Sequence, residues 1–188
     1  MIKKLGVIAL LAALLSTSAL ASGATNSVSE TGFTQGTREL GFSGSADFDS
    51  NILLNRSTLI DAEASYGVFI TDSLEVLGVG AIIFTEKEIV GSIAGVRGEY
   101  HLPSLGTAVP FVGLGANWLH SDDLGNTASL DTGLFDAALG VKYMLSPSVA
   151  LTGRIVYEYA LDDIFYEGAN KASSADNWGF DWGLRFYY

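Results

Sequence analysis

The sequence predicts an all-β fold, an eight-stranded antiparallel up-and-down transmembrane β-barrel. Three observations lead to this fold class. In the last eleven residues, Trp178 to Tyr188, large apolar side chains alternate with small or polar ones. Seven earlier segments alternate in a similar way, which is the pattern of a strand with two unlike faces. Finally, 48% of the residues are hydrophobic, yet no stretch after the N-terminal segment matches the roughly 18 apolar residues of a membrane-spanning helix.

The N-terminal segment predicts a secretory signal peptide over residues 1–21. Lys3 and Lys4 precede an apolar run over residues 5–15, and Ala19 and Ala21 supply the small-x-small pattern of a signal-peptidase site. A membrane anchor is the alternative, but this run is shorter than the roughly 20 residues that a spanning helix needs. The chain has 0 cysteines, which excludes a lipid anchor at the cleavage site, structural disulfides and thiolate chemistry.

Cleavage there leaves a polar leader over residues 22–36 and one barrel domain over residues 37–188. It removes two lysines and no acidic residue, so the net charge of −11 becomes −13. A chain this acidic has no electrostatic footprint for nucleic acid. We therefore expect no nucleic-acid partner.

Eight segments of about ten residues fit the length of tilted strands that cross a bilayer. In chain order, their apolar faces include Leu40 and Phe42, Ala62 and Tyr66, Val76 and Ile82, Ala94 and Val96, Val112 and Leu114, Leu139 and Val141, Leu151 and Ile155, and Trp178 and Phe180. The third segment is ambiguous, because Leu77, Val79 and Ala81 make its other face apolar as well. The last segment is expected to pair with the first, around residues 40–48, and so to close the barrel.

The connections alternate in length along the chain. Short turns are predicted at residues 71–72, 102–108 and 146–148, and mostly longer loops at residues 49–56, 85–89, 119–134 and 161–177. Membrane barrels of bacteria have short periplasmic turns and longer extracellular loops. With eight strands, both termini are predicted to be periplasmic.

Alternation alone does not say whether the apolar face meets lipid or a soluble barrel's core. The polar face is rich in small residues and carries few charges, as a narrow interior requires. Aromatic residues also lie near the predicted strand ends, where membrane girdles are expected. These residues are Phe48, Phe84, Tyr100, Trp118, Tyr143, Tyr159, Trp178 and Tyr188. We therefore predict that the apolar face points outward.

The interior is then predicted to hold a network of charged side chains, with the four cations neutralised by surrounding carboxylates. An eight-stranded barrel is just wide enough to be filled by side chains, so a hydrogen-bonded plug is favoured over a proton or ion path. The predicted network consists of Glu39, Asp61, Glu63, Glu75, Arg97, Glu99, Lys142, Arg154, Glu158, Asp181 and Arg185.

Three segments, residues 95–100, 109–116 and 181–188, resemble the small eight-stranded outer-membrane barrels, such as the membrane part of outer-membrane protein A and the adhesin-like protein X. The resemblance implies a location in the bacterial outer membrane. It also implies that Asp181, Gly183, Phe186 and Tyr188 form a signal for the barrel-assembly machinery, with periplasmic chaperones as partners during biogenesis. It says little about activity, because one fold hosts many functions.

A catalytic set is not predicted. Some barrels of this type modify lipids, and a lipid A deacylase of this architecture is expected to carry His and Ser two residues apart on one lipid-facing strand. Here His120 and Ser121 are adjacent and point to opposite faces, and His101 lies at a strand end on the periplasmic side. We predict no enzyme, no cofactor and no metal, and a bulk-diffusion porin is excluded because aqueous channels need about 16 strands.

The predicted function is therefore that of a non-enzymatic outer-membrane barrel that acts in envelope integrity or in surface interaction through its extracellular loops. The alternatives are a lipid A-modifying acylase or acyltransferase and a narrow, low-conductance pore. Outer-membrane lipids and lipopolysaccharide are the expected partners, and a host or surface ligand is left open. The loops are acidic, but they lack the spacing of a calcium-binding loop.

Overall fold

The computed structural model describes residues 32–47, 59–84, 89–121, 130–162, 165–167 and 172–188, and the predicted signal peptide with Ala19 and Ala21 lies outside them. No helix among the described residues is long and apolar enough to cross a membrane. The strands are β1 (Arg38–Gly44), β2 (Ala46–Asp47), β3 (Leu59–Phe69), β4 (Leu74–Phe84), β5 (Ile89–His101), β6 (Ala108–Ser121), β7 (Leu130–Ser146), β8 (Val149–Ala160), β9 (Phe165–Glu167), β10 (Ala172–Ser174) and β11 (Asp176–Tyr187).

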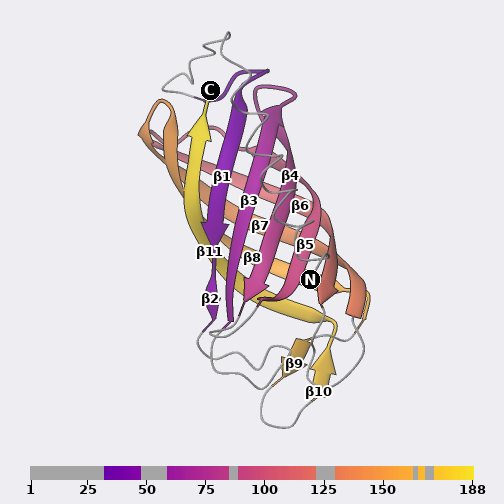
Figure 1. The fold of residues 1–188 in the computed structure, drawn as a ribbon. Helices are drawn as coiled ribbons and strands as arrows, with labels where there is room; N and C mark the ends of the chain where they lie inside the picture. The colour runs from indigo at the N-terminus through magenta and orange to yellow at the C-terminus, as the bar shows by residue number, and fades with distance from the viewer. Residues whose placement is uncertain (1–31, 48–58, 85–88, 122–129, 163–164, 168–171) are drawn as a thin grey trace.

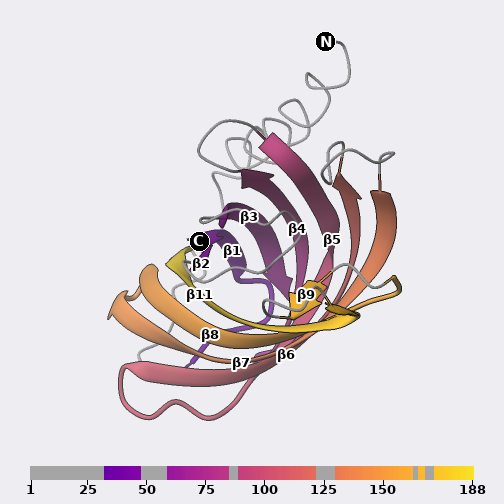
Figure 2. The same ribbon diagram turned by 90° about the horizontal axis from the view of Figure 1, so that it is seen from below.

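The main sheet is a closed antiparallel barrel. Its strand order is β1-β11-β8-β7-β6-β5-β4-β3-β2, and β1 also pairs with β3, so the sheet joins its own beginning (Figures 1 and 2). Eight strands therefore surround the interior. The short strand β2 pairs with β3, and β9 pairs with β10 in a separate hairpin. At the closing seam Leu40 lies opposite Phe186 and Gly44 opposite Trp182. The predicted fold class and the predicted pairing of the first and last strands are confirmed.

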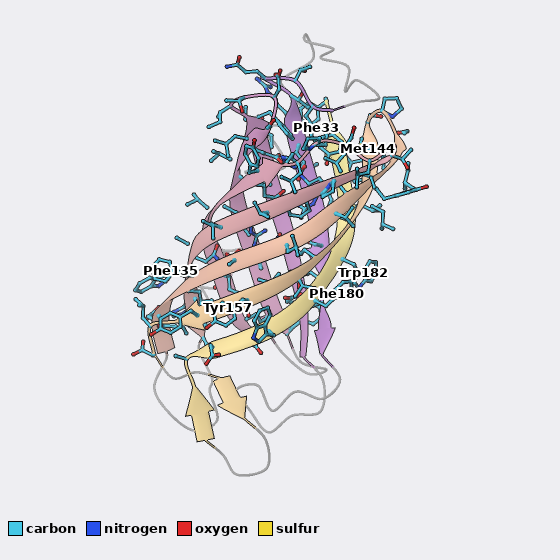
Figure 3. All side chains as sticks on the ribbon, turned by 180° about the vertical axis from the view of Figure 1, so that it is seen from behind. Phe33, Phe135, Met144, Tyr157, Phe180 and Trp182 are labelled. Atoms are coloured by element: carbon cyan, nitrogen blue, oxygen red, sulfur yellow. The ribbon has the colours of Figure 1, made fainter. Side chains whose placement is uncertain are left out.

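The two faces of the wall differ in chemistry as predicted. Large apolar side chains cover the outside: Leu114 is 72% exposed, Trp178 69% and Trp182 62%. Figure 3 shows Phe135, Phe180 and Trp182 projecting away from the wall. The ambiguous strand β4 turns Leu77, which is 0% exposed, toward the interior and leaves Val76 45% exposed. The interior is therefore apolar along part of β4, because the parity that buries Glu75 also buries Leu77.

Two predicted loop boundaries are wrong. The loop expected over residues 119–134 is shorter, because β6 continues to Ser121 and β7 begins at Leu130. The loop expected over residues 161–177 contains the β9–β10 hairpin, and β11 begins at Asp176. The strands extend further than predicted because Leu119 and Leu134 pack inside the barrel with Ala160.

The first predicted strand is interrupted at Ser45. The backbone N–H of Ser45 donates to Asp61 Oδ1 at 2.5 Å, and the strand resumes as the two residues of β2. The Asp61 carboxylate therefore accepts the hydrogen bond that a backbone carbonyl would accept in a regular ladder, and the ladder is locally interrupted.

The end of the predicted polar leader belongs to the barrel. Phe33 is 4% exposed, and its ring lies 4.4 Å from the ring of Phe69 and 4.8 Å from that of Tyr187. Gly36, with φ of +90°, then turns the chain into β1. The leader thus places an aromatic side chain in one mouth of the barrel.

The two ends of the barrel differ as the connection lengths predicted. The turn after β3 spans residues 70–73, the connection before β6 spans residues 102–107, and the turn after β7 spans residues 147–148. Gly106, with φ of +68°, allows the tight connection before β6. The C-terminus lies at this short-turn end, and β9 and β10 lie at the opposite, long-loop end (Figure 1).

Closure predicts a compact form that resists detergent. We expect the refolded protein to migrate differently on a denaturing gel when it is left unboiled than when it is boiled, because the closed ladder leaves no edge strand at which unfolding can begin. Identical migration of the two samples would contradict the closed barrel.

Candidate functional site

The interior of the barrel brings charged side chains from many strands together. All eleven residues of the predicted network lie on inward-facing positions of their strands. Successive residues of a strand face opposite sides of the sheet, and paired residues on neighbouring strands face the same side, so the inward positions continue around the barrel. Of these residues, Glu39, Glu75, Glu99, Lys142 and Arg185 are 0% exposed. The network therefore forms the polar centre of the fold.

Lys142 on β7 holds three carboxylates. Its Nζ lies 2.6 Å from Glu39 Oε2, 2.9 Å from Glu99 Oε2 and 3.0 Å from Glu75 Oε2. Four aromatic rings surround the same ammonium group at 5.3–5.9 Å from their centroids, a distance at which a cation is attracted to a π face. These rings belong to Phe33, Phe69, Phe111 and Tyr187.

Glu63 on β3 is the centre of a second group. Arg97 approaches it with two nitrogens, at 3.1 Å and 3.2 Å, and Arg154 Nη2 donates to it at 2.8 Å. Each arginine has a further carboxylate: Arg97 Nε lies 3.3 Å from Asp136, and Arg154 Nε lies 2.8 Å from Asp181. Two guanidinium groups and three carboxylates are thus joined by charge-assisted hydrogen bonds, the strong class of such bonds.

Arg185 on β11 connects the two groups. Its Nε lies 3.5 Å from Glu39 Oε1, and its Nη2 lies 4.0 Å from Glu63 Oε1. Its Nη1 donates to the hydroxyl of Ser65 at 2.5 Å. Gly41 makes room for this side chain, because a Cβ at that position would overlap the Arg185 guanidinium. The ionic network is therefore continuous along the barrel.

Apolar clusters close both ends of the network. Phe33, Phe69, Val109, Ala150 and Tyr187 pack together at the short-turn end. At the long-loop end, Leu119, Leu134 and Ala160 pack with Ile83 and Ile93. Figure 3 shows Phe33 beside Met144 at the first of these ends. The Lys142 group between the clusters is fully buried, so the described residues leave it no contact with water.

The remaining two predicted network residues, Asp61 and Glu158, lie toward the long-loop end. Asp61 accepts from the backbone of Ser45, and Glu158 accepts from Asn177 Nδ2 at 3.3 Å. With Asp136, eight inward carboxylates face four cations among the described residues. Removing any one cation would therefore leave carboxylates with too little compensation.

Two interior residues were missed by the prediction. Asp136 binds both Arg97 and Asn117, and its place on the polar face of its strand could have identified it. His101, expected at a strand end, is 4% exposed, and its Nε2 lies 3.8 Å from both Glu75 and Glu99. It shares inward parity with Glu99, two residues before it.

His101, Glu75 and Glu99 bring their ligand atoms within 4.8 Å of one another, a spacing that a metal ion could fill. The Lys142 ammonium, however, already contacts both of these carboxylates. A divalent cation would have to share these carboxylates with an adjacent ammonium of like charge. The two carboxylates of this cluster thus form part of a cage around the Lys142 ammonium.

The four residues of the predicted assembly signal lie along β11 and just beyond it. Asp181 is bound to Arg154 inside the barrel, while Phe186 lies on the outer face and Tyr188 follows the strand. A Cβ on Gly183 would collide with the backbone of Phe42 at the closing seam. Recognition of these residues by the assembly machinery stays a prediction.

Replacement of Lys142 by methionine is expected to lower the free energy of unfolding by about 3–5 kcal/mol, because three buried carboxylates lose their shared cation. Urea unfolding of the refolded protein in lipid vesicles measures this change. Arg38→Met, which removes a partly exposed charge, is the control and should cost less than about 1 kcal/mol. An unfolding midpoint of Lys142→Met equal to that of the wild type would contradict the structural role of the cage.

No protein-family model matches the sequence, and a search of curated proteins finds no match. Solved structures do resemble the barrel. The N-terminal β-barrel domain of Pseudomonas aeruginosa OprF superposes with a TM-score of 0.61 at 15% identity, covering 82% of this chain and 98% of that one. Neisserial surface protein A gives a TM-score of 0.53 at 15% identity, covering 81% and 96%. At such low identities the likeness concerns the fold, and by its fold this chain is a small eight-stranded β-barrel of the type found in bacterial outer-membrane proteins.

Proposed function

We propose that this protein is an outer-membrane barrel that contributes to envelope integrity or to surface interaction. The observation that carries the proposal is the inverted distribution of polarity. Charged groups such as Lys142 and Arg185 are fully buried, while Trp178 and Leu114 are about seven-tenths exposed. In water this arrangement would leave a large apolar surface unsatisfied, whereas a closed barrel in hydrocarbon has all of its backbone groups paired.

The interior supports a structural role for its charges over transport. Each of its four cations is paired with carboxylates, and the network is enclosed between two apolar clusters, as in a filled core. A pore would need a hydrated path past Lys142, which is 0% exposed. Contacts with lipids, lipopolysaccharide or other surfaces are therefore assigned to the outer wall and to the long-loop end.

The orientation that we propose places the short turns and both termini in the periplasm. Since the native chain has 0 cysteines, single cysteines report topology without background. Asp162→Cys, beyond β8 at the long-loop end, should react with a membrane-impermeant maleimide on intact cells. Ser148→Cys, in the turn after β7, should react only after the outer membrane has been permeabilised. The reverse labelling pattern would overturn the orientation.

The envelope role predicts a barrier defect. A deletion strain should become more sensitive to detergents and large antibiotics, or lose binding to a surface that the parent strain binds, because a protein of the outer membrane is missing. Complementation with the wild-type gene should restore the parent phenotype, and the Lys142→Met gene should restore it less well. A deletion strain with an unchanged barrier and unchanged surface binding would count against this function.

A further inference from the structure

We propose that Ser92, His120 and Asp131 on the outer wall form an ester-hydrolysing site for an acyl chain of an amphiphilic lipid. The inference goes beyond the envelope role and rests on the proposed membrane location, because an outward-facing side chain meets lipid only there. None of the three residues belongs to the interior network.

The register of three strands creates the site. Ser92 on β5 lies directly opposite His120 on β6, and His120 lies directly opposite Asp131 on β7. All three have the outward parity of Trp118, which is 55% exposed. The sequence neighbour Ser121 faces inward and is 3% exposed, so the serine of the row comes from the adjacent strand.

The histidine and the aspartate are already in contact. His120 Nδ1 lies 2.7 Å from Asp131 Oδ1, and Trp118 Nε1 donates to the same oxygen at 3.4 Å. An ionised carboxylate only accepts hydrogen bonds, so Nδ1 of His120 donates its proton to Asp131; in the neutral imidazole Nε2 then carries the lone pair. This is the relation between base and orienting group that activates a serine in hydrolases.

Ser92 is within reach of this pair. Directly opposite residues of antiparallel strands have Cβ atoms about 4.5–5.5 Å apart. A side-chain rotation can therefore bring the Ser92 hydroxyl to His120 Nε2, as commonly happens when a hydrolase binds its substrate. The side chains of His120 and Asp131 are 39% and 49% exposed, so water can reach the row.

The wall beside the row fits an acyl chain. The residue pairs that follow Ser92 toward the middle of the barrel are Gly80 with Ala94 and Gly78 with Val96. A Cβ on Gly78 or Gly80 would meet no atom within 4 Å, so no other side chain covers this strip of the outer wall at these two glycines. Trp118 stands next to it at the level expected for a headgroup. An ester linkage at the headgroup level would thus lie beside Ser92, with its acyl chain along the strip.

The reaction is hydrolysis with water as the co-reactant. The Ser92 oxygen bonds to the ester carbonyl carbon while its proton passes to His120 Nε2. The bond from carbon to the alcohol oxygen breaks, and His120 returns the proton to that oxygen, which leaves an acyl-serine. Water then bonds to the acyl carbon and gives a proton to His120, and the bond to Ser92 breaks as its oxygen regains that proton. The products are a carboxylic acid and an alcohol.

The test uses the full-length mature protein refolded into vesicles, with folding checked by gel mobility. A p-nitrophenyl ester of a long-chain acid in mixed micelles is the first substrate. Ser92→Ala and His120→Gln should lower the hydrolysis rate at least about a hundredfold, and Asp131→Asn should also lower it strongly. Ser148→Ala, in the turn after β7, is the matched control and should keep the wild-type rate. A fluorophosphonate probe should label Ser92, as located by peptide mass spectrometry.

Two lipid substrates then identify the source of the ester. Release of fatty acid from phosphatidylethanolamine–phosphatidylglycerol vesicles would assign a phospholipid, and release from purified lipopolysaccharide would assign a glycolipid. The proposal is overturned if the folded wild-type protein hydrolyses none of the three substrates, or if Ser92→Ala retains the wild-type rate. Failure of the wild type to insert into vesicles would instead overturn the membrane location on which it rests.

Discussion

Closure of the sheet between β1 and β11 is the constraint on which the rest of the structure depends. Because β1 is paired with both β3 and β11, every long strand has two neighbours. Paired residues on neighbouring strands therefore face the same side of the wall around the whole barrel. A slip of one residue in any strand would exchange its two faces, moving a group such as Arg154 outward and a residue such as Ile155 inward. The closed register therefore determines which side chains lie inside the barrel.

The ionic network follows from that constraint. A ring of eight strands is only wide enough for side chains, so inward charges cannot be solvated and must neutralise one another. Small inward residues are needed where a long side chain crosses the interior: a Cβ on Gly115, for example, would overlap the carboxylate of Asp136. Glycine on the polar face thus determines where the charges can lie, which explains why charge and glycine alternate with large residues in the same strands.

Period-two alternation was enough to predict the strand number, the closing pair and the inward position of all eleven network residues. It was ambiguous in β4, where both faces are apolar, although the predicted outer face is the one observed, and it was wrong where interior packing at the long-loop end extended the strands, as at Leu119 and Leu134. Which cation binds which carboxylate could not be predicted, because partners such as Arg185 and Glu39 lie far apart in sequence. The row from Ser92 to Asp131 was missed for a related reason: it exists only through the register of three strands.

The positions of the ion pairs around the ring have a mechanical consequence. In the ring order, β7 is three strands from β1 and three from β4, and Lys142 binds Glu39 and Glu75 on those two strands. Arg154 on β8 likewise reaches Glu63, three strands away on β3. These ion pairs therefore cross the interior and connect strands that are not neighbours in the sheet. Flattening the cross-section would stretch some of these ion pairs and compress others, so the barrel should resist lateral compression as a stiff cylinder.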